Sequence, residues 1–166
     1  MNPDTQPVPS TLIISVYKDT ENLACILDAL SMQTVPPSEI IVSEDGQDPV
    51  MKNFVDNAKQ NWPSLIHLTQ EDNGFRKNRA LNRAITQSKN DLLIFIDGDC
   101  VPHREFIRAH TEYCRPGKIA TGRRAEIGPV FSSLIKKSPL FRRLINSKWF
   151  YIPLILLMSL DKGKNV

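Results

Sequence analysis

The 166-residue sequence has few cysteines, and their positions exclude two common kinds of small domain. Cys25, Cys100 and Cys114 are widely spaced and form no Cys-x-x-Cys pair. We therefore expect neither a disulfide scaffold nor a zinc site, because both rely on paired or closely spaced cysteines. Reduced thiols are typical of the cytoplasm, which is where we expect this protein.

We also expect no segment that directs export or crosses a membrane. Residues 1–10 are polar, hold three prolines and lack the basic and then apolar order of a signal peptide. The apolar run at 149–158 is too short for a bilayer span, which needs about 20 residues. Hydrophobic residues make up 41% and charged residues 23% of the chain, which excludes disordered and fibrous proteins and is typical of one globular domain.

The net charge of +3 is small, and its basic side chains gather in the last third of the chain. They are Arg123, Arg124, Lys136, Lys137, Arg142, Arg143 and Lys148. With the apolar and aromatic run at 149–158, they predict a helical tail that packs on the core or on a missing partner. The alternative is a tail that lies against a membrane surface. We expect no nucleic-acid partner.

Hydrophobic periodicity predicts strands that alternate with helices. The predicted strands cover residues 11–17, 39–43, 65–68 and 92–96. The predicted helices cover residues 23–33, 54–62 and 81–88. This alternation is typical of parallel βαβ units, so we predict an α/β fold with a mostly parallel sheet flanked by helices. Five consecutive apolar residues, Leu92–Ile96, predict a strand that is buried on both faces.

Polar and acidic side chains follow three of these strands at the point where each strand ends. The clusters are Ser15-Val16-Tyr17, Glu44-Asp45-Gly46 and Asp97-Gly98-Asp99. Because α/β proteins bind ligands beyond the carboxyl ends of their strands, we expect the clusters to meet at one edge of the sheet. The paired aspartates suit Mg²⁺ or Mn²⁺, which prefer oxygen ligands. Taken alone, the last cluster is equally compatible with an acidic turn.

A basic and amide-rich stretch, Phe75–Arg83, lies between the second and third clusters. On a helix, Arg76, Arg79 and Arg83 share one face, and the helix N-terminus presents free backbone N–H groups. This arrangement predicts a surface that faces a diphosphate. The alternative is a basic helix face that is exposed to solvent.

Four segments stand in an informative order along the chain. They are TLIISVYKDTENLACILDALSMQT, EIIVSEDGQ, NGFRKNRALNRAI and DLLIFIDGDCVP. The order resembles the family 2 glycosyltransferases, inverting enzymes with the GT-A fold that use nucleotide sugars. The resemblance implies a nucleotide-sugar-binding GT-A core at 11–125, after a lead-in at 1–10 and before an apolar, basic helical tail at 126–166. It also implies sugar transfer to a glycan or lipid-linked acceptor in cell-surface polysaccharide synthesis.

The resemblance implies roles for individual residues as well. Ser15 and Tyr17 match positions that contact the nucleoside, and Asp45 matches the carboxylate that hydrogen-bonds the base. Arg76 resembles the basic residue near the pyrophosphate.

The last segment matches the family's Asp-x-Asp motif. In that motif the first carboxylate, here Asp97, reaches the ribose, and the second, here Asp99, binds the divalent metal, Mg²⁺ or Mn²⁺. The chain departs from the family pattern at two positions. Glu44 stands where the family commonly has Asp, and Ser15 stands where Pro is frequent.

A catalytic base is not identifiable in the sequence. The acids that follow Cys100 are Glu105, Glu112, Glu126 and Asp161, and none lies in a recognisable base motif. We therefore expect the donor-binding part of an enzyme, with a non-catalytic nucleotide-binding fragment or partner subunit as the alternative. A second alternative is a haloacid-dehalogenase-like phosphatase, whose nucleophile loop resembles Ile96–Val101.

Overall fold

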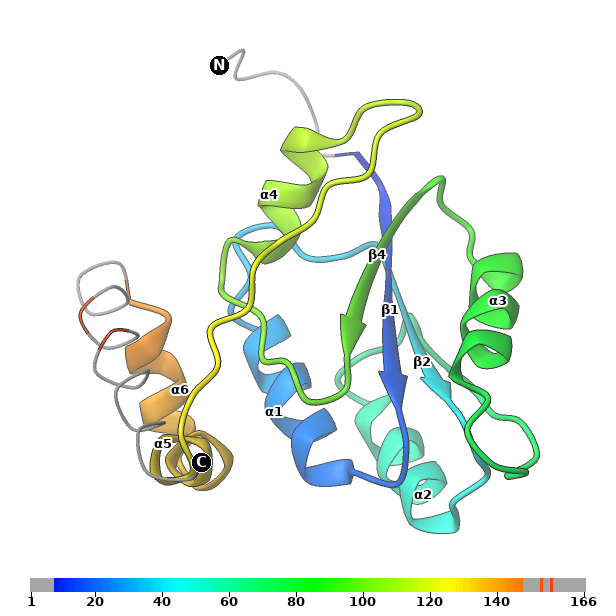
Figure 1. The fold of residues 1–166 in the computed structure, drawn as a ribbon, viewed down its shortest axis with the longest axis horizontal. Coiled ribbons are helices and arrows are strands. Elements are labelled where there is room, and N and C mark those ends of the chain that lie inside the picture. The colour runs from blue at the N-terminus through cyan, green and yellow to red at the C-terminus, as the bar shows by residue number, and fades with distance from the viewer. Residues whose placement is uncertain (1–7, 148–152, 154–155, 157–166) are drawn as a thin grey trace.

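The structure is a computed structural model that describes residues 8–147, 153 and 156. Strands and helices alternate through its first part, and helices alone follow the last strand (Figure 1). The elements are β1 (Ser10–Val16), α1 (Thr20–Leu30), β2 (Glu39–Glu44), α2 (Pro49–Ala58), β3 (Leu65–Leu68), α3 (Lys77–Gln87), β4 (Leu92–Asp97), α4 (Phe106–Tyr113), α5 (Pro129–Lys137) and α6 (Pro139–Ile145). This order confirms the predicted α/β class.

The described strands form one parallel sheet in the order β3-β2-β1-β4. Its register aligns the ends of β2, β1 and β4, because Ser15 of β1 lies opposite both Ser43 of β2 and Asp97 of β4. The three sequence clusters therefore lie at one edge of the sheet, as predicted.

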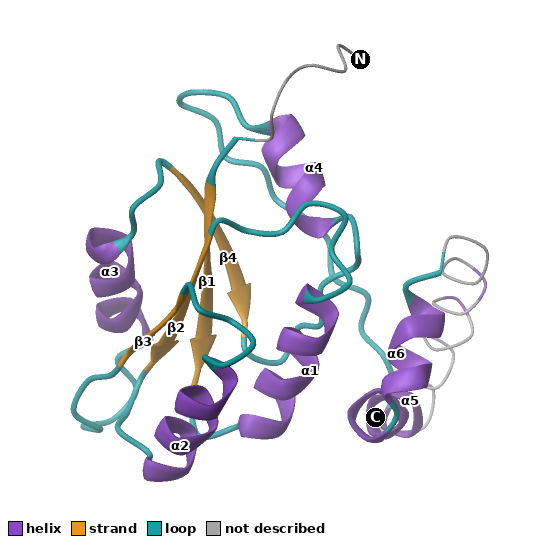
Figure 2. Cartoon of the chain, turned by 180° about the vertical axis from the view of Figure 1, so that it is seen from behind, coloured by secondary structure: helices purple, strands orange, loops and turns teal. Residues whose placement is uncertain are grey.

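Helices cover the sheet on both faces (Figures 1 and 2). Side chains of β1 alternate between the faces, as a strand requires. Leu12 and Ile14 belong to the larger core, which lies under α1, α2 and α4, whereas Ile13 packs with Ala84 of α3 on the other face. The core residues of β1 and β2 are buried, so tight packing holds in place the strand ends that carry the polar clusters.

The first two helices begin at capping side chains. Asp19 accepts a hydrogen bond from Asn22 N at 2.9 Å, and Asp48 accepts one from Val50 N at 2.8 Å. Such a cap stabilises a helix by about 1 kcal/mol, because it satisfies one of the backbone donors at the helix start. The cap at Asp48, followed by Pro49, starts α2 earlier than the apolar spacing predicts.

Strand β4 is not buried on both faces, so that prediction is wrong. Ile94 and Ile96 point into the larger core, but Phe95 is 47% exposed. The reason lies in the packing of α3, which lies mainly over β1, β2 and β3 and leaves Phe95 of β4 partly open to solvent. The apolar run Leu92–Ile96 therefore forms an edge strand and not a strand in the middle of the sheet.

The helices α5 and α6 form a hairpin that packs against α1. Phe131 and Phe141 stack with ring centroids 6.2 Å apart, beside the buried Ile135. Arg142 is 7% exposed, and its Nε donates to Asp28 Oδ2 at 2.5 Å. The sequence placed this arginine among basic residues with few acidic partners, but its guanidinium joins the hairpin to α1.

The predicted apolar run at 149–158 lies outside the described residues, apart from Pro153 and Leu156. Among the residues that are described, no helix is long and apolar enough to cross a membrane. Residues 114–128 link α4 to α5 without a helix or strand.

Candidate functional site

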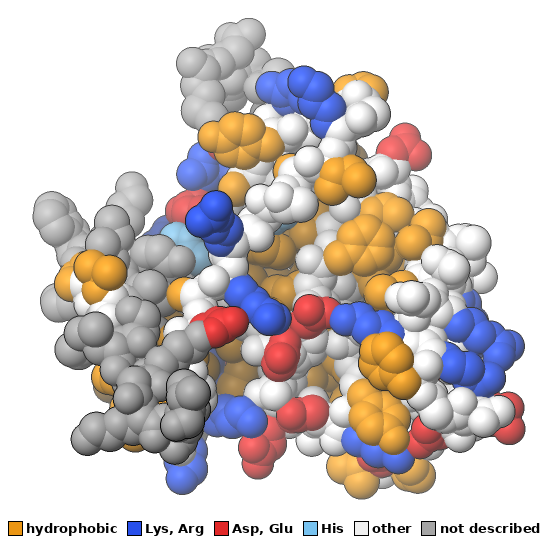
Figure 3. Space-filling view, viewed as in Figure 1, with side chains coloured by type: hydrophobic (Ala, Val, Ile, Leu, Met, Phe, Trp, Pro, Cys, Tyr) orange, Lys and Arg blue, Asp and Glu red, His pale blue; other side chains and the backbone are white. Residues whose placement is uncertain are grey.

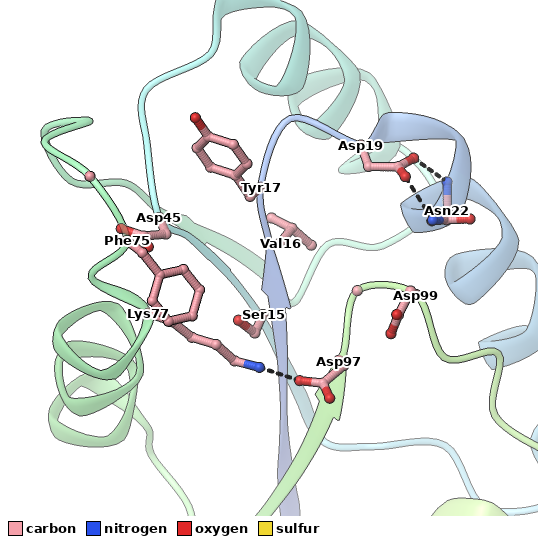
Figure 4. A pocket seen from close by; sticks show the side chains of 12 residues that line it. Ser15, Val16, Tyr17, Asp19, Asn22, Asp45, Phe75, Lys77, Asp97 and Asp99 are labelled. Carbon is pink, nitrogen blue, oxygen red and sulfur yellow. Dashed lines mark hydrogen bonds and ion pairs between the residues drawn. The ribbon is translucent and has the colours of Figure 1, made fainter. Parts of the chain in front are cut away.

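A pocket of about 560 Å³ opens at the carboxyl ends of β1, β2 and β4 (Figure 4). Its lining residues are Ser15, Val16, Tyr17, Asp19, Asn22, Asp45, Gly74, Phe75, Lys77, Asp97, Gly98 and Asp99. Five of the six site residues predicted from the sequence are in this set, and Arg76 is not. Acidic and basic side chains also meet near the lower ends of β1 and β4 in the space-filling view (Figure 3).

Gly98 brings the acidic turn against β1. A Cβ atom at this position would lie 2.6 Å from the backbone oxygen of Ser15 and 3.3 Å from Val16 Cα. A side chain cannot fit in this space without a backbone shift, so the turn needs glycine here. The close approach sets Asp97 and Asp99 beside the end of β1, where they flank the pocket.

The acidic turn offers a set of ligand atoms for a metal ion. Oxygens of Asp97 and Asp99 and the sulfur of Cys100 lie within 4.8 Å of one another. Burial raises the pKa of the Cys100 thiol, which donates to Asp99 Oδ1 at 3.3 Å. A protonated thiol is a poor ligand, so this donor set fits a hard, oxygen-seeking ion through its two carboxylates.

Lys77 contributes a cation to the pocket that the sequence reasoning did not single out. It is the first residue of α3, and its Nζ donates a hydrogen bond to Asp97 Oδ1 (Figure 4). The sequence analysis instead assigned the contact with a diphosphate to Arg76, Arg79 and Arg83 on this helix. The position of Lys77 at the helix start, next to Arg76, is the one signal in the sequence that points to it.

Asp45 is 6% exposed and holds the loop that leads to α3. Its two carboxylate oxygens accept hydrogen bonds from Gln70 Nε2 at 2.6 Å and from Arg76 N at 2.7 Å. The carboxylate is thus fixed at the pocket wall by partners within the chain. Gln70 has no recognisable motif, and only the fold identifies it as a positioning residue.

The predicted basic face does not line the pocket. Arg76 Nη2 donates to the backbone oxygen of Glu71 at 2.7 Å, and Arg83 Nη1 donates to the backbone oxygen of Thr69. The proposed contact of Arg76 with a pyrophosphate remains a prediction. Arg76 contributes to the site through its backbone N–H, which donates a hydrogen bond to Asp45, and not through its guanidinium.

Glu44 also turns away from the pocket, although it precedes Asp45 in the sequence cluster. Its side chain is fully buried, and Glu44 Oε2 lies 2.8 Å from His67 Nε2. Glu44 Oε1 accepts a hydrogen bond from Asp48 N at 2.8 Å. These bonds tie the end of β2 to β3 and to the start of α2, so Glu44 has a structural part.

Two aromatic side chains flank the pocket on the side of Asp45. The hydroxyl of Tyr17 donates to Asp72 Oδ2 at 3.3 Å, and Lys18 Nζ lies 2.7 Å from the same oxygen. The Lys18 ammonium lowers the pKa of Asp72 and keeps it charged. Phe75 is 89% exposed, which is unusual for so large an apolar side chain. The sequence reasoning gave no role to Phe75.

Two of the acids that follow Cys100 in the sequence, Glu105 and Glu112, are held by one arginine. Arg108 donates hydrogen bonds to Glu105 and Glu112. Its guanidinium lowers the pKa of Glu105 from 4.5 to about 2, so this carboxylate binds a proton poorly at neutral pH. A general base works best with a pKa near the working pH, and Glu105 is far from it.

Comparisons with known proteins identify the family of this chain. A family model described as glycosyl transferase family 2 matches residues 11–157. The glycosyltransferase AglE of Haloferax volcanii is 36% identical over 103 residues, which are 58% of this chain and 32% of AglE. The hyaluronan synthase of Pasteurella multocida is 24% identical over 115 residues, which are 66% of this chain and 11% of the synthase. This chain therefore spans about a third or less of the length of these relatives.

A solved structure has a similar fold. The mannosyltransferase PcManGT from Pyrobaculum calidifontis, in complex with GDP-Man and Mn²⁺, matches 68% of this chain and 36% of its own. The TM-score is 0.53 and the identity 23%, so the likeness concerns the fold, which is the expected GT-A type. Because the family model matches most of the sequence, this chain belongs to glycosyl transferase family 2.

Proposed function

We propose that this chain is the donor-binding part of an inverting glycosyltransferase. It binds a nucleoside-diphosphate sugar and serves transfer of the sugar to a glycan or lipid-linked acceptor at the cell surface. The observation that carries this proposal is the pocket in which Asp97 and Asp99 face Tyr17 and Asp45 across the ends of three parallel strands. The hyaluronan synthase among the relatives supports a role in polysaccharide synthesis.

The nucleoside fits the side of the pocket that carries aromatic and acceptor groups. Tyr17 and Phe75 present rings on which a base can stack, and stacking of one base on an aromatic ring is worth about 1–3 kcal/mol. Asp45 offers carboxylate oxygens to N–H groups of the base. Ser15, which also lines the pocket, offers a hydroxyl to the nucleoside.

The diphosphate fits the opposite side, at the acidic turn. Asp97 and Asp99 are the residues that would hold Mg²⁺ or Mn²⁺, and the oxygen donor set described above fits either ion. A bound divalent ion supplies positive charge that stabilises the diphosphate leaving group. The role of Asp97 toward the ribose rests on the family pattern, and its place in the pocket is compatible with it.

Transfer also needs a base that accepts the proton of the acceptor hydroxyl from the side opposite the leaving group. None of the described residues is identified as this base, and the relatives are much longer than this chain. The non-catalytic nucleotide-binding module therefore remains as the second candidate. Family membership favours either candidate over the phosphatase alternative.

The hairpin of α5 and α6 is the proposed contact with the cytoplasmic face of a membrane. Leu134, Leu140 and Leu144 are 41%, 78% and 41% exposed, although they are apolar. Residues 127–147 include four basic and no acidic side chains. Lys136, Lys137 and Arg143 are exposed, whereas Arg142 is buried against Asp28. Exposed apolar and basic side chains together favour an anionic lipid surface. Co-flotation with anionic vesicles, and none with neutral vesicles, is the expected result, whereas equal behaviour with both would contradict this contact.

Calorimetric titration of UDP, GDP and dTDP, with and without Mn²⁺, tests the donor-binding proposal. We expect one of these nucleotides to bind only with Mn²⁺ present, and Asp99→Ala to abolish that binding. Asp91→Ala is the matched control, because Asp91 is an exposed acid at the opposite end of β4. Unchanged nucleotide affinity in Asp99→Ala would contradict the proposal.

A further inference from the structure

The pocket is strongly acidic for a site that receives an anion. Four of its lining residues are aspartates, and Lys77 is the single cation among the described residues that line it. The formal charge of the lining is therefore one minus four, or −3. A nucleoside diphosphate carries further negative charge, so it cannot enter favourably unless the carboxylates are neutralised.

Lys77 already neutralises one of these carboxylates. Its ammonium donates to Asp97 Oδ1, and the Lys77 and Asp97 side chains are 32% and 49% exposed. An ion pair this accessible to water contributes little stability, about 0–1 kcal/mol, because solvent screens it. The pair is therefore easily exchanged for stronger partners.

Nearby arginines are less available for such an exchange. Arg76 and Arg83 are held by the backbone oxygens of Glu71 and Thr69, outside the pocket lining. The four-carbon stem of Lys77 starts at the first residue of α3 and points across the pocket toward β4 (Figure 4). Lys77 is thus a cation of the pocket lining that can reach both the acidic turn and a diphosphate lying between the turn and the helix.

From this geometry we infer that Lys77 is a movable counter-ion that alternates between Asp97 and the donor's diphosphate. In the empty pocket, Lys77 neutralises Asp97 and competes with a divalent ion for the carboxylate. When the donor binds, Asp97 is released to its metal and ribose contacts, and the Lys77 ammonium turns to the phosphate oxygens. This inference rests on the proposed function, since it takes the donor to be a nucleoside diphosphate.

Titration of Mn²⁺ alone into Lys77→Met tests the first half of the inference. Removal of a positive charge beside the ligand carboxylates should tighten Mn²⁺ binding by about three- to tenfold. Lys52→Met is the matched control, because Lys52 pairs with Asp56 at 2.6 Å on α2, outside the pocket. A merely structural lysine would leave Mn²⁺ affinity unchanged or weaken it, and either result would overturn the inference.

Titration of the nucleoside diphosphate at saturating Mn²⁺ tests the second half. Lys77→Met should bind it about tenfold more weakly, since a charge-assisted hydrogen bond is lost, while Lys77→Arg keeps most of the affinity. Wild-type affinity in Lys77→Met would overturn the inference and leave the proposed function intact. Failure of the wild-type protein to bind any of the three nucleotides would contradict the proposed function, and the inference would fall with it.

Discussion

Gly98→Ala should lower the stability of the protein and also displace the acidic turn that lines the pocket. The new Cβ would lie 2.6 Å from Ser15 O, a backbone atom of the central strand that cannot move aside as a side chain would. Overpacking of a rigid region costs about 1–3 kcal/mol, and a clash with backbone on both Ser15 and Val16 belongs at the upper end, about 3 kcal/mol. The strain moves the turn away from β1 and with it Asp97 and Asp99.

Urea denaturation followed by circular dichroism measures this cost. With a denaturant slope of about 2 kcal/mol/M, a loss of about 3 kcal/mol lowers the midpoint by roughly 1.5 M. Gly122→Ala is the control, because no atom lies within 4 Å of its added Cβ and its φ is not in the left-handed region. If Gly98→Ala unfolds at the same urea concentration as Gly122→Ala, the close approach of the turn to β1 is refuted.

Three further predictions concern other parts of the chain. Arg142→Met should lower the free energy of unfolding by about 2 kcal/mol in a thermal or urea melt, because the buried guanidinium loses its hydrogen bonds to the half-buried Asp28 and to the backbone oxygen of Lys136; an unchanged melt would contradict the described docking of the hairpin. Phe75→Ala should weaken nucleotide binding by about tenfold without a change in melting temperature, whereas Tyr113→Ala, which removes another exposed aromatic ring outside the pocket, should leave both unchanged. Equal nucleotide affinity in the two variants would rule out a stacking role. Arg108 lowers the pKa of Glu105 to about 2, so the folded state gains stability from this carboxylate above its unfolded pKa of 4.5 and loses it as the pH falls toward 2. Glu105→Gln should therefore melt below the wild type at pH 7, with a difference that shrinks between pH 4.5 and 2; a difference independent of pH would count against the pair.

Much of the sheet and its acidic edge could be predicted because the signals are local. Alternating strands and helices imply parallel βαβ units, and parallel strands bring their carboxyl ends to one edge without further information. Ser15, Asp45 and Asp97 each lie within one residue of the end of a strand, so the sequence pattern alone places them together. The register of β1 against its two neighbours confirms this inference.

The rest depends on contacts that sequence patterns do not encode. The arginine face of α3 looked suited to a diphosphate, but the direction of the helix leaves Lys77 in the pocket. Gln70 fixes Asp45 through a hydrogen bond between residues 25 positions apart. The apolar run of β4 does not reveal that α3 covers β1 to β3 and stops short of Phe95.

The most direct test of the account is to locate Mn²⁺ on the protein by nuclear magnetic resonance. In ¹⁵N-labelled protein with a bound nucleoside diphosphate, substoichiometric Mn²⁺ broadens amide signals according to their distance from the ion. The account predicts the strongest broadening at Gly98 and Asp99, with clear effects at Ser15 and Lys77. Broadening should be weakest near Asp91, which lies about 20 Å away along β4. Broadening centred elsewhere, or none that depends on the nucleotide, would contradict a metal-dependent donor site at this edge of the sheet.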